Sequence, residues 1–195
     1  MINQIFLISS AYLIGSLSFG IIVSKFLNLS DPRTIGSKNP GATNVMRTGN
    51  KLAAVLTLLG DILKATIVVK IVILIGLNEL ETMQVCIAVL IGHTFPIYYK
   101  FKGGKGVATA LGILLATNWI LALSAIFIWL VIFSIWRYSS LSAIIASLSV
   151  SIISYFLNDA PYILLTNVLI TVLIIFNHAS NIKKLIKGIE PSFKK

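Results

Sequence analysis

Charge and cysteine are both scarce in this chain. Only 11% of its 195 residues are charged while 57% are hydrophobic, which is too little polar surface to cover a soluble globule of this size. Acidic residues number 6 against 16 Lys and Arg, giving a formal net charge of +10. The single cysteine, Cys86, excludes an intramolecular disulfide. These shortages argue against a soluble enzyme and predict an integral membrane protein.

The scarcity of other residue types limits which ligands and partners we expect. The basic loops lack the interleaved aromatic residues of an RNA-binding surface, so we expect anionic lipid headgroups or anionic substrates and no nucleic acid. No cluster of carboxylates accompanies the polar motifs, near which we place only Asp31 and Asp61, so neither a metal nor another cofactor is expected. Met1 to Gln4 carry no Lys or Arg, which a signal peptide needs, and the first apolar run is predicted to be a membrane span. No obligatory protein partner is evident.

Seven apolar runs predict an all-α integral membrane protein with seven transmembrane helices, some of them short or broken. The fourth run has 11 residues, or about 16 Å of helix against a hydrocarbon core of about 30 Å. The runs are Ile5 to Val23, Leu52 to Leu77, Met83 to Tyr99, Val107 to Thr117, Trp119 to Trp136, Leu141 to Leu157 and Tyr162 to Phe176.

Basic residues fall in alternate connections between these runs. They follow the first, third, fifth and seventh runs, including Lys194 and Lys195 at the end, and are missing from the other connections. Because cytoplasmic loops collect Lys and Arg, the N-terminus is predicted outside and the C-terminus in the cytoplasm. Every long polar stretch then lies on the cytoplasmic side, where several loops could build one site. The chain, 1–195, is predicted to be a single domain.

The first polar stretch is GSKNPGATNVMR, from Gly36 to Arg47. Backbone amides and hydroxyls donate hydrogen bonds to phosphate oxygens, and Arg can bind them in a bidentate manner, so the stretch suits a phosphate cradle. The alternative is a solvated turn followed by a helix capped at Thr43 or Asn44.

The second polar stretch is HTFPIYYKFKGGKGVAT, from His93 to Thr109. Its three glycines let the backbone turn tightly and bring amides close to a ligand, while Lys102 and Lys105 supply positive charge. The order differs from the GxxxxGK[ST] of a P-loop, so a nucleotide triphosphatase is not supported. The stretch predicts an anion site at a membrane surface, the alternative being a flexible basic connection.

The third polar stretch, NHASNIKK, follows the last apolar run. The spacing of Asn177, His178 and Asn181 predicts that they share one helical face, although a polar helix end is the plainer interpretation. Ser140 directly follows a basic connection and is a further candidate. Asp61 and Lys64 lie three residues apart in the second run, so we expect them to pair on one helical face, which reduces their cost of burial.

Taken together, the segments GSKNPGATNVMR, GHTFPIYYKFKGGKGVAT and NHASNIKKLIKG closely resemble the three signature motifs of the bacterial acyl-phosphate:glycerol-3-phosphate acyltransferases, the PlsY-type membrane enzymes. The resemblance covers nearly the whole chain. It implies transfer of a fatty acyl group from acyl phosphate to the 1-hydroxyl of sn-glycerol 3-phosphate, giving lysophosphatidic acid and phosphate, the first step of bacterial phospholipid synthesis. It also implies a multi-pass protein of the bacterial cell membrane, surrounded by membrane lipids, with a cytoplasmic active site.

Site residues follow from these motifs. The expected catalytic residues are Ser37, Arg47, Lys105, His178 and Asn181. The residues expected to bind substrate or phosphate are Lys38, Asn39, Gly41, Thr43, Asn44, His93, Lys102, Gly103, Gly104, Gly106, Ser140 and Asn177.

Two alternatives stay open from the sequence. Neither His93 nor His178 is followed by an Asp four or five residues later, so the hydroxyl proton could pass to His178 or to a phosphate oxygen of the donor. A small membrane transporter or binding protein for an organic phosphate would also use basic loops. The polar chemistry on one side of the membrane favours the enzyme.

Overall fold

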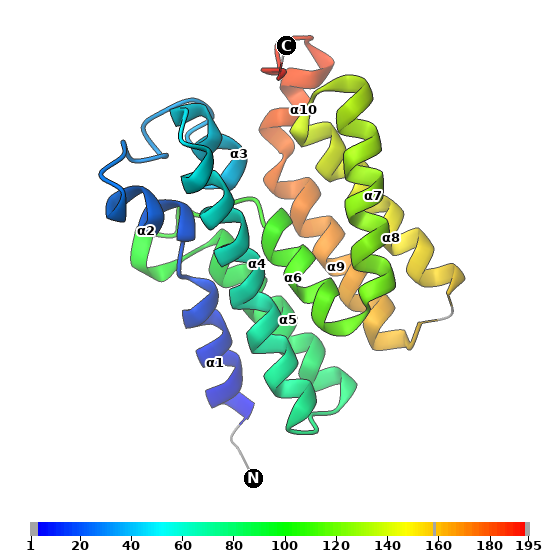
Figure 1. Cartoon of the computed structure of the whole chain (residues 1–195). Helices are drawn as coiled ribbons and strands as arrows, with labels where there is room; N and C mark the ends of the chain where they lie inside the picture. The colour runs from blue at the N-terminus through cyan, green and yellow to red at the C-terminus, as the bar shows by residue number, and fades with distance from the viewer. Residues whose placement is uncertain (1–3, 158, 194–195) are drawn as a thin grey trace. The chain divides into compact units, whose positions relative to one another are not determined.

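A computed structural model describes residues 4–157 and 159–193, so Lys194 and Lys195 of the basic tail lie outside the described residues. All regular structure in the described residues is helical (Figure 1). The chain divides into two compact units, Met1–Ala116 and Thr117–Lys195, and each is described by itself.

The first unit is built around the long helix α4, against which α1, α2, α3 and α5 pack (Figure 1). Its helices are α1 (Gln4–Gly15), α2 (Phe19–Phe26), α3 (Ala42–Val45), the 3₁₀ helix η1 (Met46–Thr48), α4 (Lys51–Leu74), α5 (Glu79–Thr94), the 3₁₀ helix η2 (Ile97–Tyr99) and α6 (Val107–Thr117).

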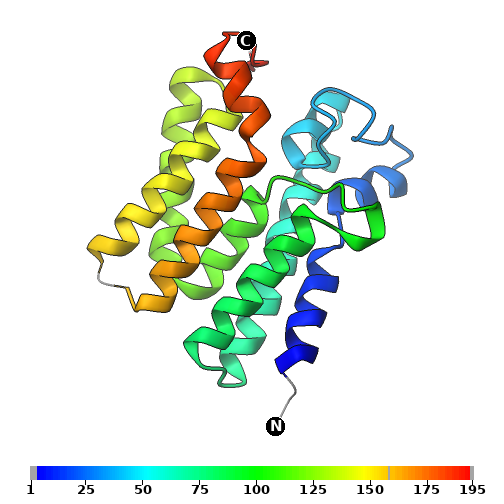
Figure 2. The same ribbon diagram turned by 180° about the vertical axis from the view of Figure 1, so that it is seen from behind.

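The second unit is a bundle in which α8 packs against both α7 and α9, and a short helix, α10, closes one end (Figure 2). Its helices are α7 (Trp119–Trp136), α8 (Ser139–Phe156), α9 (Pro161–Asn177) and α10 (Ala179–Ile186). Polar side chains join α8 to α9, where Ser151 Oγ lies 2.9 Å from Thr171 Oγ1.

The helices agree closely with the apolar runs. Val107 to Thr117 and Trp119 to Trp136 are helices with those bounds. Four helices are long and apolar enough to cross a membrane, or up to six if each bent pair is one span. The bent pairs are α1 with α2, at 45°, and α9 with α10, at 60°. The chain is thus an all-helical, multi-spanning membrane protein within the described residues.

The first predicted span is interrupted between Gly15 and Phe19. The carbonyl oxygen of Leu17 at this break accepts a hydrogen bond from Lys64 Nζ of α4 at 2.6 Å. A side chain that takes over a backbone carbonyl is an ordinary cause of a kink. A break that depends on a residue 47 positions away is not visible in the local apolar pattern.

Glycines let the backbones of the first unit approach closely. A Cβ on Gly15 would overlap the backbone of Val89, and a Cβ on Gly92 would overlap the backbone at Tyr12. Small residues at such a crossing allow α1 and α5 to pack tightly, as is common between membrane helices. Gly20 makes a similar approach to the carbonyl of Pro40, which fixes the first polar loop against α2.

Candidate functional site

Asn44 holds the first polar loop together. Its side-chain amide donates hydrogen bonds to the carbonyls of Pro32, at 2.7 Å, and Ile35, at 3.1 Å, and its Oδ1 accepts one from the Ser37 amide at 2.9 Å. The side chain is 2% exposed. The two donors and the acceptor of Asn44 therefore bind the backbone of the loop and set its path.

The helix cap considered for this loop is wrong in position. α3 begins at Ala42, preceded by Gly41, so Thr43 and Asn44 lie inside the helix. Asn39 Oδ1 accepts the Gly41 amide at 3.2 Å, which supports the turn just before the helix. Ser37 and Lys38 are exposed on the loop, Thr43 is exposed on α3, and Lys38 adopts a left-handed φ of 58°.

Arg47 lies over this loop. A Cβ on Gly36 would be 3.1 Å from Arg47 Cδ and 3.4 Å from its Nη1, so the absence of a side chain lets the guanidinium group approach the backbone. Arg47 also lines a pocket of about 500 Å³. The other lining residues are Asn28, Leu29, Ser30, Ile35, Gly36 and Thr48. An exposed arginine at a pocket with a hydroxyl at its wall can bind a phosphate group.

The glycine loop is tied to the end of α5. The amides of Gly103 and Gly104 donate to the carbonyls of Thr94 and His93, both at 3.1 Å, which turns the chain back on itself. Gly106 has a φ of +88°, a conformation that glycine adopts without strain, and α6 starts at the next residue. Lys105 is half-buried beside the N-terminus of α6, where backbone N–H groups favour an anion, and Lys102 is exposed.

His93 lies below this loop rather than on its surface. It is 5% exposed, and its Nδ1 is 2.9 Å from Lys64 Nζ and 3.5 Å from Asp61 Oδ1. The expected pair of Asp61 and Lys64 is confirmed, with 2.8 Å between Asp61 Oδ1 and Lys64 Nζ. The sequence patterns did not connect this pair with His93.

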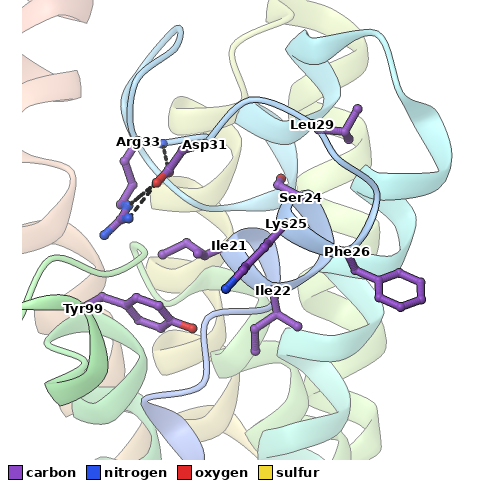
Figure 3. A pocket seen from close by; sticks show the side chains of 9 residues that line it. All are labelled: Ile21, Ile22, Ser24, Lys25, Phe26, Leu29, Asp31, Arg33 and Tyr99. Atoms are coloured by element: carbon purple, nitrogen blue, oxygen red, sulfur yellow. Dashed lines mark hydrogen bonds and ion pairs between the residues drawn. The ribbon is translucent and has the colours of Figure 1, made fainter.

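A larger groove of about 840 Å³ lies between α2 and η2 (Figure 3). Asp31 and Arg33 on its wall form a bidentate pair, with Arg33 Nη2 2.6 Å from Asp31 Oδ2 (Figure 3). The hydrogen bond from Arg33 lowers the pKa of the Asp31 carboxyl and, through the same contact, raises the pKa of Arg33. Asp31 neutralises the charge of Arg33. Among the residues that line this groove, Lys25 is therefore the one cation with no carboxylate beside it.

In the second unit, Asn177, His178 and Asn181 do not lie on one continuous helix as the spacing had assumed. The helix bends at His178, with Asn177 ending α9 and Asn181 in the first turn of α10. His178 Nδ1 lies 2.8 Å from the Ile174 carbonyl, which can only accept, so Nδ1 carries a proton. In the neutral ring the lone pair is therefore on Nε2. His178 and Asn181 are both buried, at 3% and 7% exposure, while Asn177 is half-buried.

Glu190 was missed by the sequence patterns. Its Oε1 accepts hydrogen bonds from Ser140 Oγ and Asn181 Nδ2, each at 2.7 Å, and its Oε2 is buried with no hydrogen-bond partner among the described residues. The available signal was a single acidic residue in a strongly basic C-terminal tail. The bond to Glu190 fixes the amide of Asn181 with its carbonyl oxygen directed away from the carboxylate.

Glu190→Ala is expected to destabilise the second unit by about 2–3 kcal/mol, because Ser140 and Asn181 would each lose a bond to a charged acceptor. Thermal unfolding of the detergent-solubilised protein measures this loss. Glu79→Ala, an exposed acidic residue in the first turn of α5, is the matched control and should cost less than about 1 kcal/mol. Equal effects of the two substitutions would contradict a structural bond at Glu190.

Comparisons with known proteins agree on one family. A family model described as glycerol-3-phosphate acyltransferase matches residues 5–188. The glycerol-3-phosphate acyltransferase of Methylobacillus flagellatus is 50% identical over 196 residues, covering 100% of this chain and 99% of the relative. That of Cupriavidus necator is 47% identical over 194 residues, covering 97% of this chain and 96% of the relative.

Solved structures give the same result. PlsY (YgiH), described as an integral membrane glycerol 3-phosphate acyltransferase, matches in its glycerol 3-phosphate form with a TM-score of 0.93 and 38% identity, over 98% of this chain and 96% of that one. Its lysophosphatidic acid form matches with a TM-score of 0.92 and 37% identity, over 98% and 95% of the two chains. The three polar stretches, the helical membrane fold and these matches together place the chain in the glycerol-3-phosphate acyltransferase family.

Proposed function

We propose that this chain transfers a fatty acyl group from acyl phosphate to the 1-hydroxyl of sn-glycerol 3-phosphate, giving lysophosphatidic acid and inorganic phosphate. The observation that carries the proposal is Arg47, an exposed guanidinium held over Gly36 at a pocket, in a membrane acyltransferase. The structurally similar PlsY is described in forms with glycerol 3-phosphate and lysophosphatidic acid, which are the acceptor and the product of this reaction.

Residues of the first unit hold the phosphate groups in this proposal. Arg47 and Lys105 supply the charge, and the exposed hydroxyls of Ser37 on the first loop and Thr43 on α3 donate hydrogen bonds. Asn44 shapes that loop from below. Backbone amides at the start of α6 complete the cradle. Gly103 and Gly104 shape the second loop, because their amides already bond to the carbonyls of Thr94 and His93. The other residues assigned here are Lys38, Asn39, Gly41, Lys102 and Gly106.

Residues of the second unit orient the acceptor. We assign this role to His178 and Asn181, assisted by Asn177 and Ser140. The hydroxyl oxygen of glycerol 3-phosphate attacks the carbonyl carbon of the acyl phosphate, a new C–O ester bond forms, and the C–O bond to phosphate breaks. The mixed anhydride is already activated, so positioning and charge neutralisation supply most of the acceleration. The hydroxyl proton passes to a phosphate oxygen of the donor or to His178 Nε2.

The topology is part of the proposal. Seven spans, with the N-terminus outside and the C-terminus in the cytoplasm, agree with the alternation of basic loops and put the site on the cytoplasmic side of the bacterial cell membrane. The short α6 then counts as a span. The whole chain acts as one acyltransferase domain, since the family match extends across both units.

The test is direct. Purified protein in detergent or lipid bilayers is incubated with acyl phosphate and glycerol 3-phosphate, and lysophosphatidic acid and phosphate are measured together. We expect equal amounts of the two products. Acyl-CoA and acyl-carrier protein thioesters replace acyl phosphate in parallel reactions, and turnover only with a thioester would overturn the assignment of the donor. Folded protein that forms no lysophosphatidic acid with any donor would overturn the function.

A further inference from the structure

Three ionisable side chains meet inside the first unit, away from its surface. Asp61 and Lys64 come from α4 and His93 from α5, and they are 2%, 5% and 5% exposed. Taking charged groups out of water inside apolar helices costs several kcal/mol, and an apolar pair of similar size is often as stable. Stability alone therefore does not account for this cluster.

Lys64 is the centre of the cluster. Its Nζ lies 2.8 Å from Asp61 Oδ1, 2.6 Å from the Leu17 carbonyl and 2.9 Å from His93 Nδ1. An ammonium group has three N–H donors and no acceptor, so these three contacts use all of its hydrogen-bonding capacity. His93 Nδ1 must then be the acceptor, and the proton of the neutral imidazole is on Nε2. Asp61 and Lys64 thereby fix both the orientation and the tautomer of His93.

The imidazole of His93 in turn determines the path of the glycine loop. A Cβ on Gly104 would overlap His93 Nε2, so the ring lies directly against the glycine backbone. The Gly104 amide also donates to the His93 carbonyl at 3.1 Å. Lys105 is the next residue in the chain. A shift of the His93 ring would therefore move the backbone that carries Lys105.

We propose that Asp61 and Lys64 are positioning residues, which hold His93 in the Nε2–H form against Gly104 and so keep the glycine loop and Lys105 in the geometry that binds phosphate. The proposal rests on the proposed function, in which Lys105 binds a phosphate group. It assigns His93 to the support of the loop rather than to direct contact with substrate. The pairing of Asp61 with Lys64 therefore affects the glycine loop, in addition to lowering the cost of burying the two charges.

The double variant Asp61→Leu/Lys64→Met tests this role, because it removes the polar cluster without leaving a buried charge. We expect a modestly lowered thermal stability, because the Leu17 carbonyl and His93 Nδ1 lose their donor. We also expect a loss of about 10²-fold in kcat/KM, since a displacement of about 1 Å near a site has effects of that size. Thr57→Val is the matched control. Thr57 is a buried polar residue of α4 whose hydroxyl donates to the Ala53 carbonyl of the same helix, and its variant should keep full activity.

A double-mutant cycle with Gly104→Ala separates positioning from a general loss of structure. Both changes act through the same loop, so the combined variant should lose little more activity than the worse of the two alone. Additive losses would overturn the proposal. So would full activity of Asp61→Leu/Lys64→Met.

An activity-independent measurement keeps this proposal distinct from the proposed function. The chain has two histidines, so His178→Gln leaves His93 as the single imidazole for nitrogen NMR of the ¹⁵N-histidine-labelled protein. We expect an unprotonated Nδ1 and a protonated Nε2, and a protonated Nδ1 overturns the proposal even if Asp61→Leu/Lys64→Met fails to fold. If the wild-type protein has this His93 tautomer but no acyltransferase activity, the proposed function is refuted while the described contacts of Asp61, Lys64 and His93 stand.

Discussion

Arg47→Ala is expected to lower kcat/KM by about 10²–10³-fold, which is the usual effect of removing one preorganised donor from developing negative charge. Arg47 lies over Gly36 and lines its pocket with an exposed side chain, so its guanidinium group can reach a phosphate group bound there. Steady-state rates with each substrate varied in turn measure the loss. Membrane insertion and thermal stability should match those of the wild type.

Two further variants sharpen this prediction. Arg47→Lys keeps the charge but loses the planar fork, so we expect it to recover only part of the lost activity. Lys51→Ala removes an exposed cation at the start of α4, close in sequence, and should leave activity unchanged. If Lys51→Ala is as inactive as Arg47→Ala, general surface charge explains the effect. Arg47→Ala with normal kinetics would refute a role in phosphate binding.

The helices could be predicted well because membrane burial leaves a strong local signal. Val107 to Thr117 and Trp119 to Trp136 have the expected bounds, since polar residues or glycine flank them directly. The break after Gly15 was not predicted as such, because the group that stabilises it is Lys64 of another helix. The bend at His178 was also missed, because a spacing of three and four residues assumes a continuous helix.

The candidate site was predicted at the level of motifs but not of contacts. Glycine, lysine and arginine mark phosphate chemistry by residue type, so the loops containing Arg47 and Lys105 were evident. The partners of Asn44 were not, because the carbonyls of Pro32 and Ile35 carry no sequence signal. Family membership identifies an acyltransferase rather than the transporter that basic loops alone would also have allowed.

His178→Ala is expected to lower kcat/KM by about 10²-fold while keeping the acidic limb of its pH profile. His178 Nδ1–H donates to the Ile174 carbonyl, which holds the ring at the bend between α9 and α10. The chain has no Asp four or five residues after His178 to form the His-Asp pair of other acyltransferases. We therefore expect the ring to orient the acceptor while a phosphate oxygen of the donor takes the hydroxyl proton.

The shape of the pH profile, rather than the size of the loss, distinguishes the two roles of His178. A general base contributes about 10²–10⁴-fold and imposes its own ionisation on kcat/KM, so its removal would abolish the acidic limb. A positioning ring leaves that limb to the ionisation of the donor phosphate, which the substitution does not change. Ser180→Ala, an exposed neighbour on α10, controls for local disturbance and should leave both rate and profile unaltered. Disappearance of the acidic limb in His178→Ala alone would make His178 Nε2 the proton acceptor.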